Sequence, residues 1–147
     1  MPVNEADLYL GTWELVPELS LYELGPVPAS GTYEITRAGE GVQVRIRWTM
    51  QAGGPEQSTA FGGPADGVPQ ALPAAAAQGG GPDAFSLTRV DGRTLDSAAL
   101  RGGAVVAYAR RVASVDGGLL ATVQEGSRPD GSRFRNFQVY RRVGASS

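Results

Sequence analysis

The segment from Val42 to Gln51 alternates strictly between apolar and polar residues, and this pattern constrains the fold more than any other feature of the chain. Successive side chains of a β-strand point to opposite faces, so a period of two maintained over this length predicts a strand with one apolar face. The apolar positions are Val42, Val44, Ile46, Trp48 and Met50. We expect this face to point into a core or a cavity.

Further segments with strand character are separated by turn residues. Asp-Gly occurs four times, at Asp66, Asp91, Asp116 and Asp130, and each occurrence predicts a tight turn. The other expected strands are Thr32 to Arg37, Phe85 to Val90, Thr94 to Leu100, Val105 to Val112, Leu119 to Glu125 and Phe134 to Val143. Such regular spacing predicts an all-β meander that folds over as a sandwich or closes into a single antiparallel up-and-down barrel of about 8–10 strands.

Two regions interrupt this regularity. Pro17 to Leu24 predicts a turn or two of helix before Gly25-Pro26 ends it. Residues 53–83 are rich in Gly, Pro and Ala; they predict two short strands, Gln57 to Phe61 and Gly67 to Leu72, followed by a flexible loop around Ala74 to Gly81. A linker between domains is the alternative, but the remainder of the chain is too short for a barrel of its own. We therefore expect one domain over residues 1–147.

The composition is that of a globular protein, with 41% hydrophobic and 19% charged residues. All 13 basic residues are arginines, a bias typical of a GC-rich genome, although arginine also suits phosphate recognition. These arginines are scattered along a chain of net charge -2. Nucleic-acid binding needs a concentrated positive field, so no nucleic-acid partner is expected.

The chain lacks His, Cys and Lys, and these absences exclude most common catalytic sites. There is no imidazole base, no histidine ligand for zinc or haem iron, no thiolate and no lysine for a Schiff base. The aspartates of the Asp-Gly turns are explained by turn geometry, and Asp96 belongs to no recognisable carboxylate pair. We expect no metal and no cofactor.

The first ten residues contain Glu5 and Asp7 and have no basic or strongly apolar stretch, so they do not form a signal peptide. The longest apolar runs, such as Ala104 to Ala109, are much shorter than a membrane span. For the chain as given, unless a signal peptide was trimmed from it, the expected location is cytoplasmic.

Motifs at both ends of the chain resemble a known superfamily. Gly11-Thr12-Trp13-Glu14-Leu15-Val16 resembles the opening strand of lipocalins and fatty-acid-binding proteins, and Val139-Tyr140-Arg141-Arg142-Val143 resembles their closing strand. The resemblance implies that Trp13 plugs the closed end of a barrel, where a basic residue from the last strands stacks on its indole. Residues 86–94 and 110–117 also resemble small bacterial lipocalin-like proteins without an established role.

The resemblance further implies a cavity for a small apolar molecule. Fatty-acid-binding proteins hold the ligand carboxylate with an Arg-x-Tyr pair on the last strand, where this chain has Gln138-Val139-Tyr140. A hydroxyl or carbonyl ligand would suit Gln138 better than an anion. The helical lid of the family is shortened or missing, because residues 17–30 contain three prolines. Haem-binding relatives use histidine, which this chain lacks.

The candidate ligand-binding residues come from three of the expected strands. They are Val44, Ile46, Trp48, Met50, Tyr108, Arg110, Asn136, Gln138 and Tyr140. Arg110 shares a face with Tyr108, so it is expected to anchor a ligand, to cap Trp13 or to lie at a rim. Trp48 and Met50 suit a packed core as well as a ligand contact. The mixed polar face of the last strand suits a solvated cavity or a rim strand.

The leading hypothesis is a soluble, non-catalytic binding protein for a small hydrophobic or amphipathic ligand. A filled barrel that acts as a structural or protein-interaction module is the alternative. A third hypothesis is an enzyme that uses Tyr140, Tyr108 or Arg110 in a cavity, and it predicts a strongly shifted tyrosine or carboxyl pKa inside the barrel.

Overall fold

The computed structural model describes residues 3–72, 81–128 and 130–143, and it contains one antiparallel sheet of eleven strands. The strands are β1 (Gly11–Leu15), β2 (Leu21–Tyr22), β3 (Ser30–Ala38), β4 (Gly41–Thr49), β5 (Glu56–Pro64), β6 (Gln70–Ala71), β7 (Ala84–Asp91), β8 (Thr94–Arg101), β9 (Ala104–Ala113), β10 (Leu119–Ser127) and β11 (Arg133–Arg142). Among these residues no helix is long and apolar enough to cross a membrane.

The first and last long strands of the chain lie side by side. The sheet order is β5-β4-β3-β1-β11-β10-β9-β8-β7-β6, with β2 added beside β11. Trp13 of β1 lies opposite Arg142 of β11, and Leu15 lies opposite Tyr140. The prediction of an all-β barrel is confirmed, because β1 and β11, from the two ends of the chain, pair with each other and so connect the two halves of the sheet.

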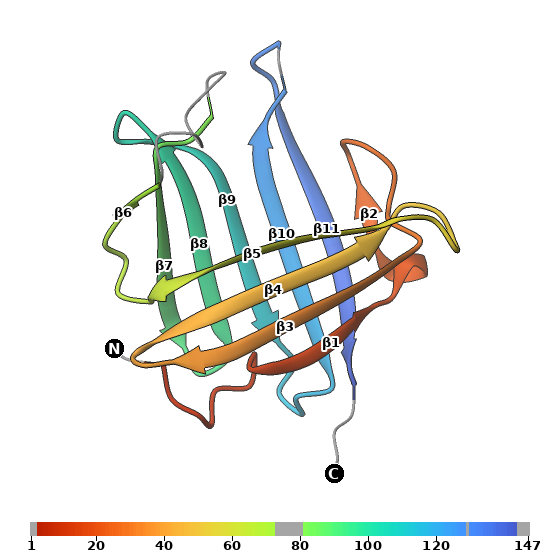
Figure 1. Ribbon diagram of the computed structural model, residues 1–147, viewed down its shortest axis with the longest axis horizontal. Helices are drawn as coiled ribbons and strands as arrows, with labels where there is room; N and C mark the ends of the chain where they lie inside the picture. Colours follow the sequence, from red (N-terminus) through yellow and green to blue (C-terminus); the bar gives the residue numbers. More distant parts are fainter. Residues whose placement is uncertain (1–2, 73–80, 129, 144–147) are drawn as a thin grey trace.

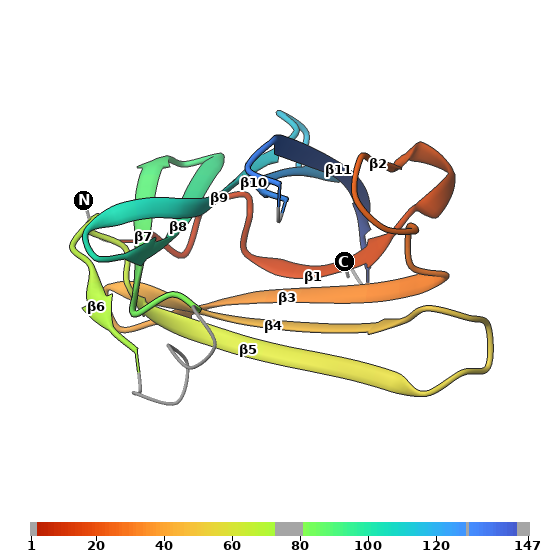
Figure 2. The same ribbon diagram turned by 90° about the horizontal axis from the view of Figure 1, so that it is seen from above.

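The barrel is flattened into two layers. β3, β4 and β5 run across β7 to β11 at a steep angle (Figure 1), and the view from above separates the two layers (Figure 2). β1 pairs with both β3 and β11 and so connects the layers. On the opposite side β5 lies near β7, with no ladder between these two strands in the described residues, so the barrel is nearly closed.

The densest part of the core lies at the end where β1, β3 and β4 meet β7, β8 and β10. The largest side chains that are completely buried are Tyr9, Trp13, Ile35, Val42, Val44, Leu87, Leu95 and Leu120. Each strand contributes apolar residues at alternate positions, as the pattern of β4 predicts. The interior nearer the other end of the barrel is lined by buried polar and aromatic side chains, such as Arg111, Tyr33 and Tyr140, together with half-buried apolar ones.

The predicted helix over Pro17 to Leu24 is wrong. Only Pro17–Leu19 forms a single 3-10 turn, and β2 then pairs with β11, with Tyr22 opposite Asn136. The Ser20 hydroxyl donates a hydrogen bond to the Val16 carbonyl, which closes the turn. Pairing with a neighbouring strand satisfies the backbone groups of so short a segment better than an isolated helix would.

The glycine-rich region also differs from its prediction. β5 extends to Pro64, beyond the predicted Gln57 to Phe61, because Gly62 allows the strand to continue close to β4. A Cβ on Gly62 would lie 2.5 Å from the Val42 carbonyl oxygen. β6 is shorter than the predicted Gly67 to Leu72. Except for Gly81, the predicted loop Ala74 to Gly81 lies outside the described residues.

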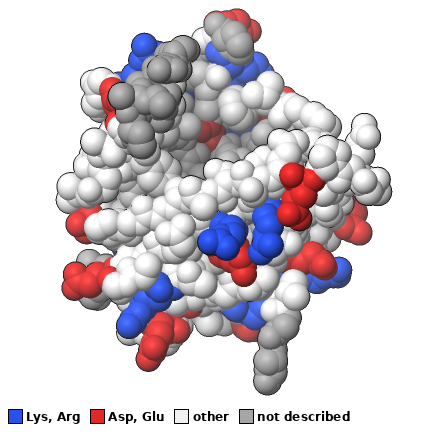
Figure 3. Space-filling view, viewed as in Figure 1, with Lys and Arg blue, Asp and Glu red and all other residues white. Residues whose placement is uncertain are grey.

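The face of the molecule formed by β3, β4 and β5 carries charges of both signs (Figure 3). Arg47 Nη2 on β4 lies 3.1 Å from Glu34 Oε1 on β3, and both side chains are partly exposed. Exposed pairs of this kind contribute about 0–1 kcal/mol. Charges of both signs therefore share this face, and no patch of one sign covers it.

Candidate functional site

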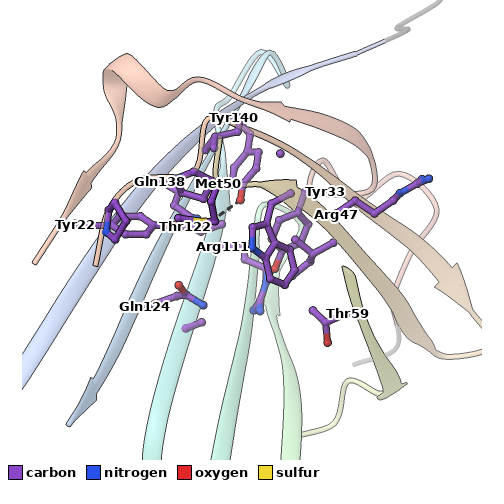
Figure 4. A pocket seen from close by; sticks show the side chains of 17 residues that line it. Tyr22, Tyr33, Arg47, Met50, Thr59, Arg111, Thr122, Gln124, Gln138 and Tyr140 are labelled. Carbon is purple, nitrogen blue, oxygen red and sulfur yellow. Dashed lines mark hydrogen bonds between the residues drawn. The ribbon is translucent and has the colours of Figure 1, made fainter. Parts of the chain in front are cut away.

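The interior wall of the candidate site is formed by alternate residues of β9, β10 and β11. Ala109 and Arg111 of β9 line the site, as do alternate residues of β10 and β11, and Figure 4 shows Arg111 pointing into it. On β10 and β11 these residues are Thr122, Gln124, Gln138 and Tyr140. The small side chain of Ala109 leaves space that a larger residue would fill.

Two hollows open against this wall, and we call them the first and the second compartment. The first has a volume of about 290 Å³. It is lined by Leu15, Tyr22, Pro26, Pro28, Gly31, Tyr33, Ile46, Arg47, Trp48, Met50, Thr59, Ala109, Arg111, Thr122, Gln124, Gln138 and Tyr140. The second, of about 300 Å³, is lined by Leu24, Phe61, Phe85, Ser97, Ala99, Ala107, Tyr108, Ala109, Arg111, Gln124, Glu125, Phe134 and Asn136.

Arg111 is a buried cation between the two compartments. It is 4% exposed, its Nε donates a hydrogen bond to the Tyr33 hydroxyl, and its guanidinium carbon lies 5.8 Å and 5.6 Å from the ring centres of Tyr33 and Phe61. Within the described residues no ion pair includes Arg111, and its Nη1 atom has no hydrogen-bond partner. A buried charge without a counter-charge is costly, so an acceptor from outside the chain would satisfy it.

Tyr33 provides a second hydrogen-bond donor beside Arg111. Its hydroxyl is held beside Arg111, and its ring makes an edge contact with Tyr140 at 5.2 Å between ring centres. Because the Tyr33 oxygen accepts the bond from Arg111, its proton remains free for another acceptor. Arg111 and Tyr33 together therefore offer two converging donors to one group.

The part of the wall that β10 and β11 contribute to the first compartment is polar, and its polar side chains bond to one another. Gln138 Oε1 accepts hydrogen bonds from the hydroxyls of Thr122 at 3.0 Å and Tyr140 at 3.1 Å, and Gln138 Nε2 donates to the Tyr22 hydroxyl. Burial raises the pKa of Tyr140 and of Tyr22. Both phenols therefore stay protonated at neutral pH, and neither is suited to act as a base.

The predicted residues of β4 divide between the core and the site. Ile46 and Trp48 of β4 line the first compartment, as does Met50, which follows the end of β4 and is 37% exposed. Val44 is completely buried in the core and lines neither compartment. The apolar face of β4 thus runs from the packed end of the barrel into the hollow end.

The predicted residues of β11 have different surroundings. Gln138 and Tyr140 belong to the wall of the first compartment, and Asn136 to that of the second. Asn136 Oδ1 accepts hydrogen bonds from the backbone N–H groups of Glu23 and Leu24, and its Nδ2 donates to the Leu24 carbonyl. The Asn136 amide is therefore occupied by the chain itself.

Of the three roles expected for Arg110, those of an internal ligand anchor and of a cap on Trp13 are wrong. Its side chain is 46% exposed and forms a two-point ion pair with Asp96 on the outer surface. The Tyr108 hydroxyl donates to the same carboxylate at 2.7 Å, although Tyr108 also borders the second compartment. The ion pair with Asp96 raises the pKa of Arg110. Of the apolar neighbours that indicated a pocket, Tyr108 borders the second compartment, whereas Val106 and Val112 lie on the same outer face of β9 as Arg110.

Arg111, Tyr33 and Gln124 were not predicted for the site. On β9 the inner positions carry Arg111 and alanines, whereas the outer positions carry the valines and Tyr108, so hydrophobicity points to the wrong face. The run of alternate alanines before Arg111 was the usable signal, since small residues inside a barrel leave room for a ligand.

The closed end of the barrel is tightly bonded. Trp13 is completely buried, its Nε1 donates to the Tyr9 carbonyl at 3.0 Å, and the Arg142 guanidinium carbon lies 4.2 Å from the centre of its ring. Arg142 also donates to the carbonyls of Leu8 and Leu10 at 2.6 and 2.8 Å. Burial lowers the pKa of Arg142. The cation over Trp13 is therefore Arg142 and not Arg110.

No protein-family model matches the chain, and no curated protein matches its sequence. Solved structures with a similar fold include two lipid-binding or bile-acid-binding proteins. The apo Caenorhabditis elegans lipid binding protein 8 aligns with a TM-score of 0.52 and 13% identity, covering 89% of this chain and 94% of that one. The zebrafish ileal bile acid-binding protein complexed with cholic acid aligns with a TM-score of 0.51 and 13% identity, covering 92% of this chain and 99% of that one. The fold is the fatty-acid-binding-protein-like barrel.

The polar groups inside this barrel are arranged differently from the Arg-x-Tyr motif of fatty-acid-binding proteins. Gln138 stands where the last-strand motif has arginine, and the cation of the interior is Arg111 on β9. The short β2 lies where the resemblance led us to expect a reduced helical lid. The similarity of residues 86–94 and 110–117 to small bacterial lipocalin-like proteins stays a prediction.

Proposed function

We propose that this protein binds a small amphipathic molecule inside the barrel and that Arg111 holds a carbonyl or carboxylate group of that molecule. The observation that carries the proposal is the Arg111 Nη1 atom, which is buried beside a cavity and has no partner among the described residues. Hydrogen bonds from a charged donor contribute about 1.5–3 kcal/mol, and an unsatisfied buried donor costs a similar amount.

The chemistry of the walls supports an amphipathic ligand over a purely apolar one. Ile46, Trp48 and Met50 offer apolar contact, whereas Arg111 and the Tyr33 hydroxyl offer donors. The two similar folds belong to proteins described as binding lipid and bile acid, and both ligand classes combine an apolar body with oxygen acceptors. Cavities of this volume are large enough for a small ligand, and they argue against the alternative of a filled structural barrel.

The test measures the affinity of the fluorescent anion 1-anilinonaphthalene-8-sulfonate for the unmodified protein and for the variants Arg111→Met and Arg110→Met. We expect Arg111→Met to weaken binding about tenfold or more, because a charge-assisted hydrogen bond is lost while the volume of the side chain is kept. Arg110→Met is the matched control: it removes the neighbouring arginine from the outer surface and should change the affinity less than about twofold.

The proposal is overturned if the unmodified protein does not bind the probe at micromolar concentration, or if Arg111→Met binds it as tightly as the unmodified protein does. Equal losses in Arg111→Met and Arg110→Met would likewise indicate a surface effect of charge instead of an internal anchor.

A further inference from the structure

The position of Arg111 relative to the two compartments restricts the shape of the ligand. Arg111, Ala109 and Gln124 line both compartments, so these three residues mark the junction between them. The free donor of Arg111 therefore does not lie at the far end of a single tunnel. It lies where two hollows of similar volume meet.

Both compartments offer apolar surface on their own side of this junction. The first is bordered by Leu15, Ile46 and Trp48. The second is bordered by an aromatic group in which Phe61 and Phe85 meet edge to face, with 5.0 Å between their ring centres. A ligand that fills both must have an apolar part on each side of its polar group.

Several polar groups away from the junction are already occupied. Gln138, Thr122 and Tyr140 bond to one another in the first compartment, and the Asn136 amide in the second is bonded to the backbone of Glu23 and Leu24. The hydrogen bonds found among the described residues leave Arg111 Nη1 without a partner, and Gln124, which is exposed, adds an amide at the same place. The acceptor of the ligand is thus best received at the junction and not at either end.

From this arrangement we infer that the ligand is a carboxylic acid or carbonyl compound whose polar group lies near the middle of the molecule, with an apolar arm in each compartment. This inference rests on the proposed function and specifies the ligand class for the same site. A straight-chain acid whose terminal carboxylate meets Arg111 can fill only one of the two compartments in an extended form.

The experiment compares two isomeric acids, hexadecanoic acid and 2-hexyldecanoic acid, as competitors for the bound 1-anilinonaphthalene-8-sulfonate, below the concentrations at which either forms micelles. The isomers have the same formula and similar hydrophobicity, and they differ in the position of the carboxylate. We expect the branched acid to bind about tenfold more tightly or better, because its second arm buries further methylene groups.

A filled second compartment provides the structural control. Ala99→Phe places a ring in that compartment and should reduce the preference for the branched acid to about twofold or less, while the affinity for hexadecanoic acid stays within about twofold. Ala98→Phe alters the neighbouring alanine of β8, which lines neither compartment, and should keep the preference.

The inference is overturned if the unmodified protein binds the linear acid as tightly as the branched one, or binds neither acid while still binding the probe through Arg111. It is also overturned if Ala99→Phe keeps the full preference. These outcomes differ from failure of the proposed function, in which the probe itself does not bind or does not depend on Arg111.

Discussion

Arg111 is held in the interior by weak partners. A hydroxyl oxygen and the faces of two aromatic rings surround its guanidinium, and these contacts offset part of the cost of removing the charge from water. By contrast, Arg89 makes a two-point ion pair with Asp7, at 2.7 and 2.9 Å, near the closed end of the barrel. Arg89 is therefore fully ion-paired at the closed end, whereas one donor atom of Arg111 in the cavity has no hydrogen-bond partner among the described residues.

Asp7 should make the stability of the protein depend on pH. Burial opposes ionisation of this carboxyl, but hydrogen bonds from Arg89, the Asn4 backbone and Tyr9 outweigh it and lower its pKa below 3.8. Its contribution is then complete above about pH 4 and is lost as the pH falls through the lowered pKa. We expect Asp7→Asn to reduce the free energy of unfolding at pH 7 by about 3 kcal/mol.

Urea denaturation between pH 7 and pH 2 measures this effect. The unmodified protein should lose stability more steeply in acid than Asp7→Asn does, and Glu5→Gln, on the exposed part of the same segment, should behave like the unmodified protein. Parallel acid curves for the unmodified protein and Asp7→Asn would show that the ion pair with Arg89 has no such role.

Sequence periodicity predicted the neighbouring arginines on the wrong sides of β9. The pattern correctly requires Arg110 and Arg111 to face opposite ways, but the choice of side was based on the apolar residues near Arg110. That choice fails in a barrel with a hollow interior, where alanine and arginine line the cavity and valines lie partly exposed outside. The ion pair between Arg110 and Asp96 depends on the register of two strands, which the sequence alone does not show.

At the scale of elements, residues 20–29 form a strap beside β11 at the hollow end of the barrel. Tyr22, Pro26 and Pro28 of this strap line the first compartment, and Leu24 lines the second. Only the two residues of β2 pair with β11, and most of the other attachments are side-chain hydrogen bonds, such as those of Asn136. A segment held by so few backbone hydrogen bonds opens locally at little cost in free energy. We therefore expect the ligand to enter and leave beneath the strap.

A disulfide across this pairing tests the expectation. Leu21 and Phe137 lie opposite each other and are exposed, and the chain has no native cysteine, so Leu21→Cys with Phe137→Cys gives one defined bond. Oxidation should slow both uptake and release of 1-anilinonaphthalene-8-sulfonate about tenfold in stopped-flow fluorescence, with little change in affinity. The reduced form of the same variant is the control, and equal rates in both forms would place the path elsewhere.

The strands themselves were largely predictable, because alternation and Asp-Gly turns are local properties of the sequence. β4 and the hairpins of the second half follow the predicted pattern closely. The strap and β5 did not, since β2 exists only through its pairing with Asn136 and Phe137, and β5 continues through glycines that read as a loop. Both depend on contacts between residues distant in the sequence.

At the scale of the whole molecule, the barrel combines a packed end with a hollow end. Trp13, Ile35 and Leu120 are completely buried in the packed end, whereas the hollow end contains the two compartments and the partly unsatisfied Arg111. Sites that bind ligands often include groups that destabilise the free protein, since the ligand later satisfies them. We therefore expect Arg111 to serve binding at the expense of the stability of the free protein.

The free energy of unfolding of Arg111→Met, measured without ligand by urea denaturation, tests this claim most directly. We expect Arg111→Met to be more stable than the unmodified protein by about 1–2 kcal/mol, because a buried cation without a counter-charge is replaced by an apolar side chain. Arg110→Met, which loses only its partly exposed ion pair, should be less stable by up to about 1 kcal/mol. A clear loss of stability in Arg111→Met would contradict the account and make Arg111 a structural residue of the barrel.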